Sequence, residues 1–294
     1  MVKRIESTSS RTAAWTCVSR AASALEKNPH YRSDDKLALE LVPRMIHFLL
    51  HSGLIRRLFT RRIAPAGIYE YVIARTHYID DTYHRALQDD FDQILIFGAG
   101  FDTRALRCQP NCKQTTIFEL DSKKTQQAKV AQYKKRGLMI PSNLVFIPID
   151  FDKDDLPYKL DKAGFEKKKR SLFIMEGLLM YLKPKSVHET FKLIKKYSGE
   201  RSRVVFDYIY DSVLKQENLY YGEEAIFQNV SKAGEAWQFG LKKGKLKDFL
   251  SEYDLVMLDH KDSEAFEKIY FTDPNGKNVG RVNGTHCLVT AEIA

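Results

Sequence analysis

A short apolar segment that runs into closely spaced glycines is the feature that most constrains this chain. It reads QILIFGAGFDTR over residues 93–104, and its apolar part, residues 94–97, is too short for a helix and rich in strand formers. Gly98 and Gly100 follow directly, where a backbone must turn tightly and admit a ligand. A strand that ends in such a turn is typical of the first strand of a nucleotide-binding α/β sheet, although a GxG pattern alone can also be only a tight turn.

A second apolar run, at residues 115–121, ends in two acids, Glu119 and Asp121. A carboxylate at the end of this second strand can accept hydrogen bonds from ribose hydroxyls. A dinucleotide fingerprint requires a third glycine three residues after the second, but Thr103 stands at that position. The two runs together therefore indicate a nucleoside-type cofactor and argue against NAD and an NAD-dependent oxidoreductase.

Predicted strands alternate with helices from residue 91 onward, at 93–98, 115–120, 144–149, 171–176 and 203–209. This alternation predicts an α/β fold with a doubly wound parallel sheet that helices cover on both faces. Ligands of such sheets bind beyond the carboxyl ends of the strands. After the first strand, those ends carry the acids Glu119, Asp121, Asp150, Glu176 and Asp207. One such acid is commonly a helix cap, but their recurrence indicates the rim of a cleft.

Residues 1–90 are predicted to form an N-terminal helical extension, or cap, in which Pro43 should kink or divide one helix. Residues 55–63 carry four arginines among apolar residues. They could form a basic amphipathic helix that meets a membrane or a partner, or a packed helix with arginines at its rim. A third helix, at residues 68–87, includes Arg75 among its apolar positions, where the side chain either snorkels or reaches for an anion in a cleft.

The C-terminal part departs from the alternation. Residues 211–242 are irregular and rich in aromatic side chains, which fits either a lid or substrate wall or a plain helical excursion. Residues 255–259 and 286–293 are predicted strands that pair most simply as an antiparallel hairpin. We therefore expect one domain over residues 1–294, with a cofactor-binding core at 91–210 and a C-terminal helix and strands at 243–294.

Composition narrows the function classes only slightly. The net charge of +9 permits nucleic acid, a membrane surface or an anionic substrate, and a solvated basic surface is the simpler interpretation. None of the four cysteines (Cys17, Cys108, Cys112 and Cys287) forms a CxxC pair, and no zinc spacing occurs, so no metal is expected. The N-terminus, MVKRIESTSSR, lacks the apolar core of a signal peptide, and no apolar run is long enough to span a bilayer. These features predict a cytoplasmic protein with reduced thiols.

Several separate segments together resemble the leucine carboxyl methyltransferase family of class I S-adenosylmethionine-dependent methyltransferases. They are RTHYIDD at residues 75–81, GAGFDTR at 98–104, FELD at 118–121 and EGLLMYL at 176–182. SRTA at 10–13, SRA at 19–21 and DDKLA at 34–38 are more similar to the bacterial small-molecule branch than to the protein-modifying branch. The resemblance runs from about residue 7 to about residue 210, and more loosely to the end. It implies a Rossmann-like, seven-stranded, mostly parallel sheet with an antiparallel C-terminal hairpin.

The resemblance also implies how S-adenosyl-L-methionine would be bound. Arg75 matches the ligand of the cofactor carboxylate, which a guanidinium can contact at two points. Gly98 and Gly100 let the backbone pass close to the methionine part. Asp121 matches the ligand of the two ribose hydroxyls, with Glu119 as a weaker alternative.

The remaining cofactor contacts follow from the same resemblance. Asp150 and Phe151 match the neighbours of the adenine ring, one for its exocyclic amine and one for packing. Glu176 matches the position near the cofactor ammonium. Arg20 could replace a basic cofactor contact of the family.

The implied reaction is in-line methyl transfer to an oxygen of a small-molecule acceptor. A carboxylate acceptor needs no general base, whereas a hydroxyl acceptor needs a group that takes its proton. Tyr181 is the preferred acceptor-side residue because it lies near the end of the fourth-strand motif, although it could simply pack there. Further candidates for the base are Asp207, Tyr208 and His84.

Alternative functions are a protein C-terminal carboxyl methyltransferase, an RNA methyltransferase and a cofactor-binding protein without catalysis. The N-terminal pattern argues against the first, and the absence of an added RNA-binding domain argues against the second. Intact Arg75, Asp121 and Glu176 argue against the third. We therefore expect a small-molecule acceptor, no nucleic acid and no membrane as partners, with the oligomeric state left undefined.

Overall fold

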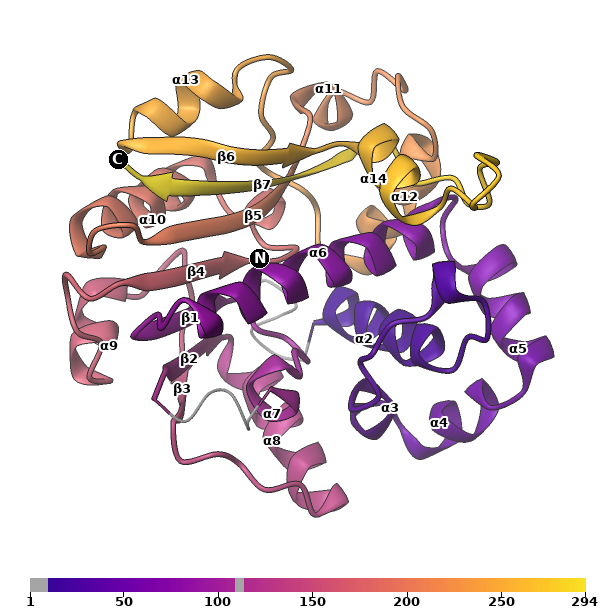
Figure 1. The fold of residues 1–294 in the computed structure, drawn as a ribbon, viewed down its shortest axis with the longest axis horizontal. Helices are drawn as coiled ribbons and strands as arrows, with labels where there is room; N and C mark the ends of the chain where they lie inside the picture. The colour runs from indigo at the N-terminus through magenta and orange to yellow at the C-terminus, as the bar shows by residue number, and fades with distance from the viewer. Residues whose placement is uncertain (1–9, 109–113) are drawn as a thin grey trace.

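The computed structural model describes residues 10–108 and 114–294, so residues 1–9 and Cys112 lie outside the described part (Figure 1). A seven-stranded sheet runs through it in the order β3-β2-β1-β4-β5-β7-β6. Its strands are β1 (Gln93–Phe97), β2 (Thr116–Asp121), β3 (Leu144–Pro148), β4 (Ser171–Met175), β5 (Arg203–Ile209), β6 (Leu255–Lys261) and β7 (His286–Ile293). The neighbours among β1–β5 are parallel, and β7 pairs antiparallel with both β5 and β6. The predicted doubly wound sheet with its C-terminal antiparallel pair is thus confirmed.

The central strands are buried along their whole length. In β1, Leu95 pairs with Phe118 of β2 on one side and with Phe173 of β4 on the other, and all three side chains are fully buried. A strand that packs on both faces must be apolar throughout, which is why these strands appear in the sequence as continuous apolar runs. Helices supply the two covering layers (Figure 1).

The helices that follow the parallel strands are α7 (Arg104–Arg107), α8 (Lys123–Arg136), α9 (Leu156–Lys162), η4 (Leu179–Tyr181), α10 (Pro184–Tyr197), α11 (Asp211–Leu214) and α12 (Glu223–Ala233). Two further helices, α13 (Leu246–Ser251) and α14 (Ser263–Tyr270), flank β6 in the chain. After α12, the backbone amides of Gln238 and Phe239 donate to the Met180 carbonyl at 2.6 and 3.3 Å. Residues 234–239 therefore lie over η4, at the carboxyl end of β4.

The N-terminal part is helical, as predicted. It contains α2 (Arg11–Ala24), η1 (Pro29–Tyr31), α3 (Ala38–Leu41), α4 (Arg44–Leu50), α5 (Gly53–Leu58), η2 (Phe59–Ile63) and α6 (Ile68–Gln88). Pro43 separates α3 from α4, because proline cannot continue the hydrogen-bond ladder of a helix interior. In the described part of the chain, no helix has the length and apolar character that crossing a membrane requires.

Residues 55–63 are helical, as predicted, but the helix changes type within this segment. The α-helix α5 ends at Leu58, and η2 continues as a π-helical turn in which the Ala64 amide donates to the Phe59 carbonyl at 3.0 Å. This wider turn is typical of a helix that accommodates a local packing demand. The Phe59 ring stacks on Trp15 of α2 with centroids 5.2 Å apart, which supplies such a demand.

Candidate functional site

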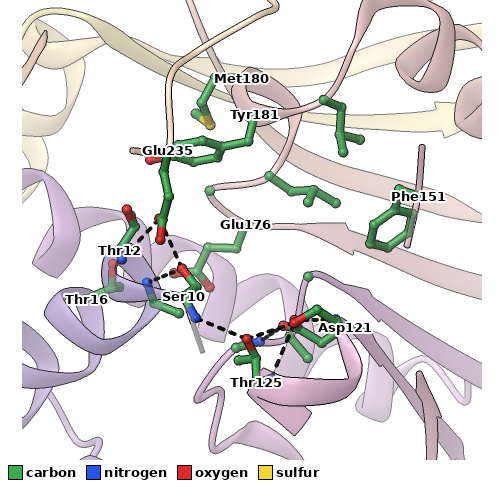
Figure 2. Close-up of a pocket in the computed structure, with 18 of the residues that line it drawn as sticks. Ser10, Thr12, Thr16, Asp121, Thr125, Phe151, Glu176, Met180, Tyr181 and Glu235 are labelled. Carbon is green, nitrogen blue, oxygen red and sulfur yellow. Dashed lines mark hydrogen bonds between the residues drawn. The ribbon is translucent and has the colours of Figure 1, made fainter. Parts of the chain in front are cut away.

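A cavity of about 970 Å³ lies at the carboxyl edge of the parallel strands, between that edge, α2, α6 and residues 234–238 (Figure 2). All eight site residues predicted from the sequence line it: Arg75, Gly98, Gly100, Asp121, Asp150, Phe151, Glu176 and Tyr181. The cavity has two sides. We call the part lined by the ends of β1, β2 and β3 the β1–β3 side. The part lined by residues 176–182 after β4, the start of β7 and residues 234–238 is the β4–β7 side.

The glycine turn after β1 opens onto the β1–β3 side. Gly98 and Gly100 have φ values of +65° and +50°, a region that side chains disfavour. A Cβ atom on Gly98 would lie 3.0 Å from Leu178, and one on Gly100 would lie 3.1 Å from Ala13. Backbone conformation and close neighbours therefore both favour glycine at these two positions.

Asp121 ties the end of β2 to this turn. Its Oδ2 atom accepts a hydrogen bond from the Gly100 amide at 2.5 Å, and its Oδ1 atom accepts one from the Ser122 amide at 2.5 Å. Burial raises the pKa of Asp121, while these two amides oppose that rise. Each carboxylate oxygen has a second lone pair, so the side chain can still accept two further hydrogen bonds.

Arg75 reaches the cavity from α6. Its Nη1 atom donates to Asp207 Oδ2 at 2.7 Å, and its Nε atom lies 3.0 Å from Glu176 Oε1. Burial alone would lower the pKa of Arg75, but the two carboxylates raise it, so the guanidinium stays charged. Its Nη2 atom has no hydrogen-bond partner within the described ranges and remains available to an anion in the cavity.

Glu176 is held by a second guanidinium beneath the cavity. Arg104 is fully buried and contacts Glu176 Oε2 at 2.8 Å, Asp80 Oδ1 at 2.7 Å and the carboxylate of Asp102. Burial would raise the pKa of Glu176, but Arg104 and Arg75 hold it below its usual value. The Glu176 carboxylate is therefore ionised and fixed in position at the cavity wall.

The far end of the β1–β3 side combines a half-exposed acid with an aromatic ring. Asp150 Oδ1 accepts from the Asp152 amide at 3.0 Å, and Asp150 Oδ2 lies 3.6 Å from Lys153 Nζ. The half-buried Phe151 ring packs on Phe97 of β1 with centroids 5.9 Å apart. A flat heterocycle with an amino group could lie against this ring and donate to this carboxylate.

Glu119, the weaker alternative for the ribose, does not line the cavity. It is almost completely buried and accepts from Lys129 Nζ of α8 at 2.6 Å. Burial raises the pKa of Glu119 to about 7, and Lys129 opposes that rise. The two acids of β2 thus have different surroundings, although they lie two residues apart in the strand and therefore point to the same face of the sheet.

Arg20 lines the cavity, but its hydrogen bonds are made within the protein. Its Nη1 atom lies 3.0 Å from Asp35 Oδ2, and its Nη2 atom donates to the Phe101 carbonyl at 2.7 Å. Arg20 therefore fixes α2 against the glycine turn.

Three of the candidate bases, His84, Tyr208 and Asp207, do not line the cavity. His84 Nε2 lies 3.4 Å from Cys108 Sγ, and Tyr208 hydroxyl lies 3.2 Å from His260 Nε2; neither residue lines the cavity. Asp207 is fully buried and already accepts from Arg75, from the Tyr71 hydroxyl at 2.7 Å and from the Gly177 amide at 2.6 Å. These predictions are wrong because sequence position alone does not tell which side chains reach the cavity.

Tyr181 lies on the β4–β7 side, beneath residues 234–238 (Figure 2). Burial raises the pKa of its hydroxyl to about 12, and contacts with Trp237 and Thr12 oppose the rise. The Gln238 side chain donates to the Tyr181 carbonyl at 2.7 Å, which fixes the backbone of η4 to this segment.

Glu235 joins the same segment to the first turn of α2. Its carboxylate accepts from the Arg11 amide at 2.8 Å. It also accepts from the Thr12 amide at 3.2 Å and the Ser10 hydroxyl at 3.2 Å (Figure 2). A carboxylate at a helix N-terminus satisfies amides that have no partner within the helix. Glu235 and α2 together cover the cavity.

His286, the first residue of β7, lines the cavity and was missed in the sequence. Its ring packs on Tyr71 with centroids 4.5 Å apart and meets Trp237 edge-on at 5.5 Å. The signal that could have found it is the predicted antiparallel strand, because such a strand begins at the edge where its parallel neighbours end.

Comparisons of this chain with known proteins show the family to which it belongs. A family model described as leucine carboxyl methyltransferase matches residues 13–195, more than half of the chain. A protein of Mycolicibacterium smegmatis, named as a candidate S-adenosyl-L-methionine-dependent methyltransferase, is 32% identical over 137 residues, which are 47% of this chain and 43% of that protein. The chain thus spans less than half the length of this relative. A Bacillus subtilis protein with the same kind of name is 23% identical over 82% of this chain and 84% of its own.

Among solved structures, a candidate methyltransferase from Thermobifida fusca is 12% identical with a TM-score of 0.60. The similarity covers 94% of each chain. At this identity the likeness shows a common fold and nothing about substrates.

Proposed function

The chain belongs to the leucine carboxyl methyltransferase family of class I methyltransferases, and from that membership we propose that it transfers a methyl group from S-adenosyl-L-methionine to an oxygen of a small molecule. The observation that carries the proposal is the cavity, in which a glycine turn, a strand-end carboxylate and a charged arginine meet at the carboxyl edge of the sheet.

The residues of the β1–β3 side fit this cofactor. The glycine turn forms a cradle that Cβ atoms would fill, and Asp121 keeps two lone pairs for ribose hydroxyls. Asp150 and Phe151 suit the amino group and the face of adenine. Each of these contacts has the chemistry that one part of the cofactor needs.

The methionine end of the cofactor would lie toward β4. The free Nη2 donor of Arg75 suits its carboxylate, and the ionised Glu176 suits its ammonium group. Arg75 and Glu176 also bind each other, so each holds the other in the orientation that the ligand requires.

The bound cofactor supplies an electrophilic methyl group on a sulfonium, which is already a good leaving group. The protein therefore has to align the acceptor oxygen with that methyl group and to exclude water. Tyr181 and Trp237 border the place where the acceptor would lie, and residues 234–238 with α2 cover it. We assign residues 211–242 the role of a lid and substrate wall.

A small-molecule acceptor fits this enclosure better than a protein tail. Glu235 bridges from the lid to α2 across the cavity, and three donors of α2 and its cap hold its carboxylate. A folded protein partner would need this bridge to open before its C-terminus could enter. This observation supports the small-molecule activity over the protein-modifying alternative.

Calorimetric titration with S-adenosylmethionine and S-adenosylhomocysteine tests the proposal. We expect micromolar binding to the wild-type protein, loss of that binding in Asp121→Ala, and unchanged binding in Asp161→Ala, whose carboxylate makes an exposed pair with Lys167. A folded wild-type protein that binds neither ligand would refute the proposed function.

A further inference from the structure

Asn283 orients the hydrogen bonds around His286. Its Nδ2 atom donates to the Ala66 carbonyl at 2.9 Å, so its Oδ1 atom faces the other way. Oδ1 accepts from the Thr285 amide at 3.1 Å, which confirms that an oxygen and not an amino group occupies this position. The same Oδ1 lies 2.5 Å from Thr285 Oγ1.

This arrangement fixes the proton on His286. The Thr285 hydroxyl has one proton, and it must go to Asn283 Oδ1, which has none to give. Thr285 Oγ1 is 2.7 Å from His286 Nδ1 and can only accept there, so Nδ1 carries the ring proton. A neutral imidazole has one N–H, and therefore Nε2 of His286 presents a lone pair.

That lone pair is available to a ligand. His286 lines the cavity, and its Nε2 atom has no hydrogen-bond partner in the part of the chain that the structure describes. The Tyr71 ring lies against one face and Trp237 meets the ring edge-on, so the imidazole cannot swing away. Burial first, and then the charge of Arg75, lower the pKa of His286 to about 3, so the ring is neutral at physiological pH.

His286 lies on the acceptor side of the cavity. It pairs with Ile209 at the end of β5, whereas Asp121 ends β2, and the strand order separates β2 from β7 by β1, β4 and β5. The cofactor contacts of adenine and ribose are thus on one side, and the His286 lone pair is on the other.

Resting on the proposed function, we propose that the methyl acceptor is a neutral hydroxyl compound with a flat apolar body, whose O–H donates to His286 Nε2. A lone pair attracts a hydroxyl proton and repels a carboxylate, which has no proton to donate. Tyr71, Trp237 and Met180 supply apolar surface around this acceptor. A hydroxyl acceptor is thus favoured over a carboxylate acceptor, the two possibilities that the sequence left open.

The reaction balances with His286 as the proton acceptor. The hydroxyl oxygen forms a bond to the methyl carbon, the carbon–sulfur bond breaks, and its electron pair remains on sulfur. The hydroxyl proton passes to Nε2, and the imidazolium later releases it to water. Because the oxygen becomes strongly acidic as it gains the methyl group, even a weakly basic imidazole takes its proton.

Paired probes test the acceptor class. With S-adenosylhomocysteine bound, we expect 2-naphthol to bind the wild-type protein about tenfold more tightly than 2-naphthoate. His286→Phe keeps a ring of similar shape but lacks the lone pair, so it should lose this preference and the methylation of 2-naphthol. Equal or tighter binding of 2-naphthoate, or no binding of 2-naphthol, would overturn the inference.

The proton position has its own test. Nitrogen-15 spectra of the imidazole should show a protonated Nδ1 and an unprotonated Nε2 whose resonance shifts when 2-naphthol binds. Thr285→Val should weaken 2-naphthol binding because it removes the acceptor for Nδ1–H, and Thr285→Ser should not. A protonated Nε2 in the wild-type protein would also overturn the inference. Calorimetry with S-adenosylhomocysteine alone reports separately on the proposed function, since none of these variants touches Asp121 or the glycine turn.

Discussion

The two sides of the cavity differ in how the chain builds them. On the β1–β3 side, Asp121 binds the amides of Gly100 and Ser122, so a strand end and a turn hold each other through backbone groups. On the β4–β7 side, side chains far apart in the sequence hold one another. Glu235 binds Ser10 across 225 positions, and Tyr71 binds Asp207 across 136.

This difference follows from what each side is proposed to bind. A cofactor shared by the enzymes of a family can be held by backbone conformation, which tolerates change in surrounding side chains. An acceptor that differs between enzymes is better recognised by side chains on movable segments, because substituting them leaves the sheet intact. Variants that act on both sides, on one side, or on the bridge between α2 and the lid test whether the two sides are held together in different ways.

Removal of Arg104 should damage both sides at once. Arg104→Met leaves Asp80, Asp102 and Glu176 without their shared buried partner, and we expect a loss of about 3–5 kcal/mol in the free energy of unfolding. Urea denaturation followed by circular dichroism measures it. Arg203→Met, which breaks partly exposed pairs, should cost no more than about 1 kcal/mol. Equal losses would show that the cluster beneath the cavity is not a common support.

Asp121→Asn should affect the β1–β3 side alone. The amide keeps the side-chain size but loses the charge and one acceptor, so we expect about 100-fold weaker binding of S-adenosylhomocysteine. Tyr181→Phe should leave that dissociation constant unchanged within about threefold and lower methyl transfer instead. If calorimetry finds similar losses of affinity in the two variants, the division into two sides does not hold.

The β4–β7 side should carry its own dependence on pH. The pKa of His286 in the folded protein, about 3, lies below its unfolded value, so below about pH 6.5 the unfolded state binds more protons. Stability should therefore fall with decreasing pH, by about 2 kcal/mol between pH 7.5 and pH 5. His286→Phe should lack this part of the loss. Parallel unfolding free energies for both proteins between pH 7.5 and 5 would contradict a buried neutral histidine.

The difference between the β1–β3 side and the β4–β7 side also explains which strands and site residues could be predicted from the sequence. The strands β1 to β5 begin and end within one residue of the predicted bounds, because fully buried parallel strands are short apolar runs bounded by polar residues or glycine. The glycine turn and the acids at the carboxyl ends of β2, β3 and β4 line the cavity because parallel strands end at one edge. Each of these signals lies in a short stretch of sequence, and together they predict mainly the residues of the β1–β3 side.

The β4–β7 side depends on pairings that no local signal encodes. His286 reaches the cavity because β7 inserts between β5 and β6, which the sequence pattern of a simple hairpin does not specify. Tyr208 and Asp207 are neighbours on β5, yet one meets His260 and the other meets Arg75. Neither side chain lines the cavity, and which partner each one meets is decided by how α6, β6 and β7 pack around β5, which sequence spacing alone could not predict.

The bridge between the lid and α2 should give the smallest effect. Glu235→Gln keeps the shape of the side chain but removes the charge that three donors at the start of α2 share. We expect S-adenosylhomocysteine to dissociate about fivefold faster, which corresponds to about 1 kcal/mol, the usual worth of a charge at a helix N-terminus. Stopped-flow fluorescence measures the rate. Glu224→Gln on the exposed face of α12 is the matched control, since its carboxylate accepts a hydrogen bond from the Gln228 side chain of the same helix. An unchanged dissociation rate in Glu235→Gln would mean that the backbone contacts of residues 238–239 with η4 hold the cover over the cavity. The β4–β7 side would then be built like the β1–β3 side, through backbone groups.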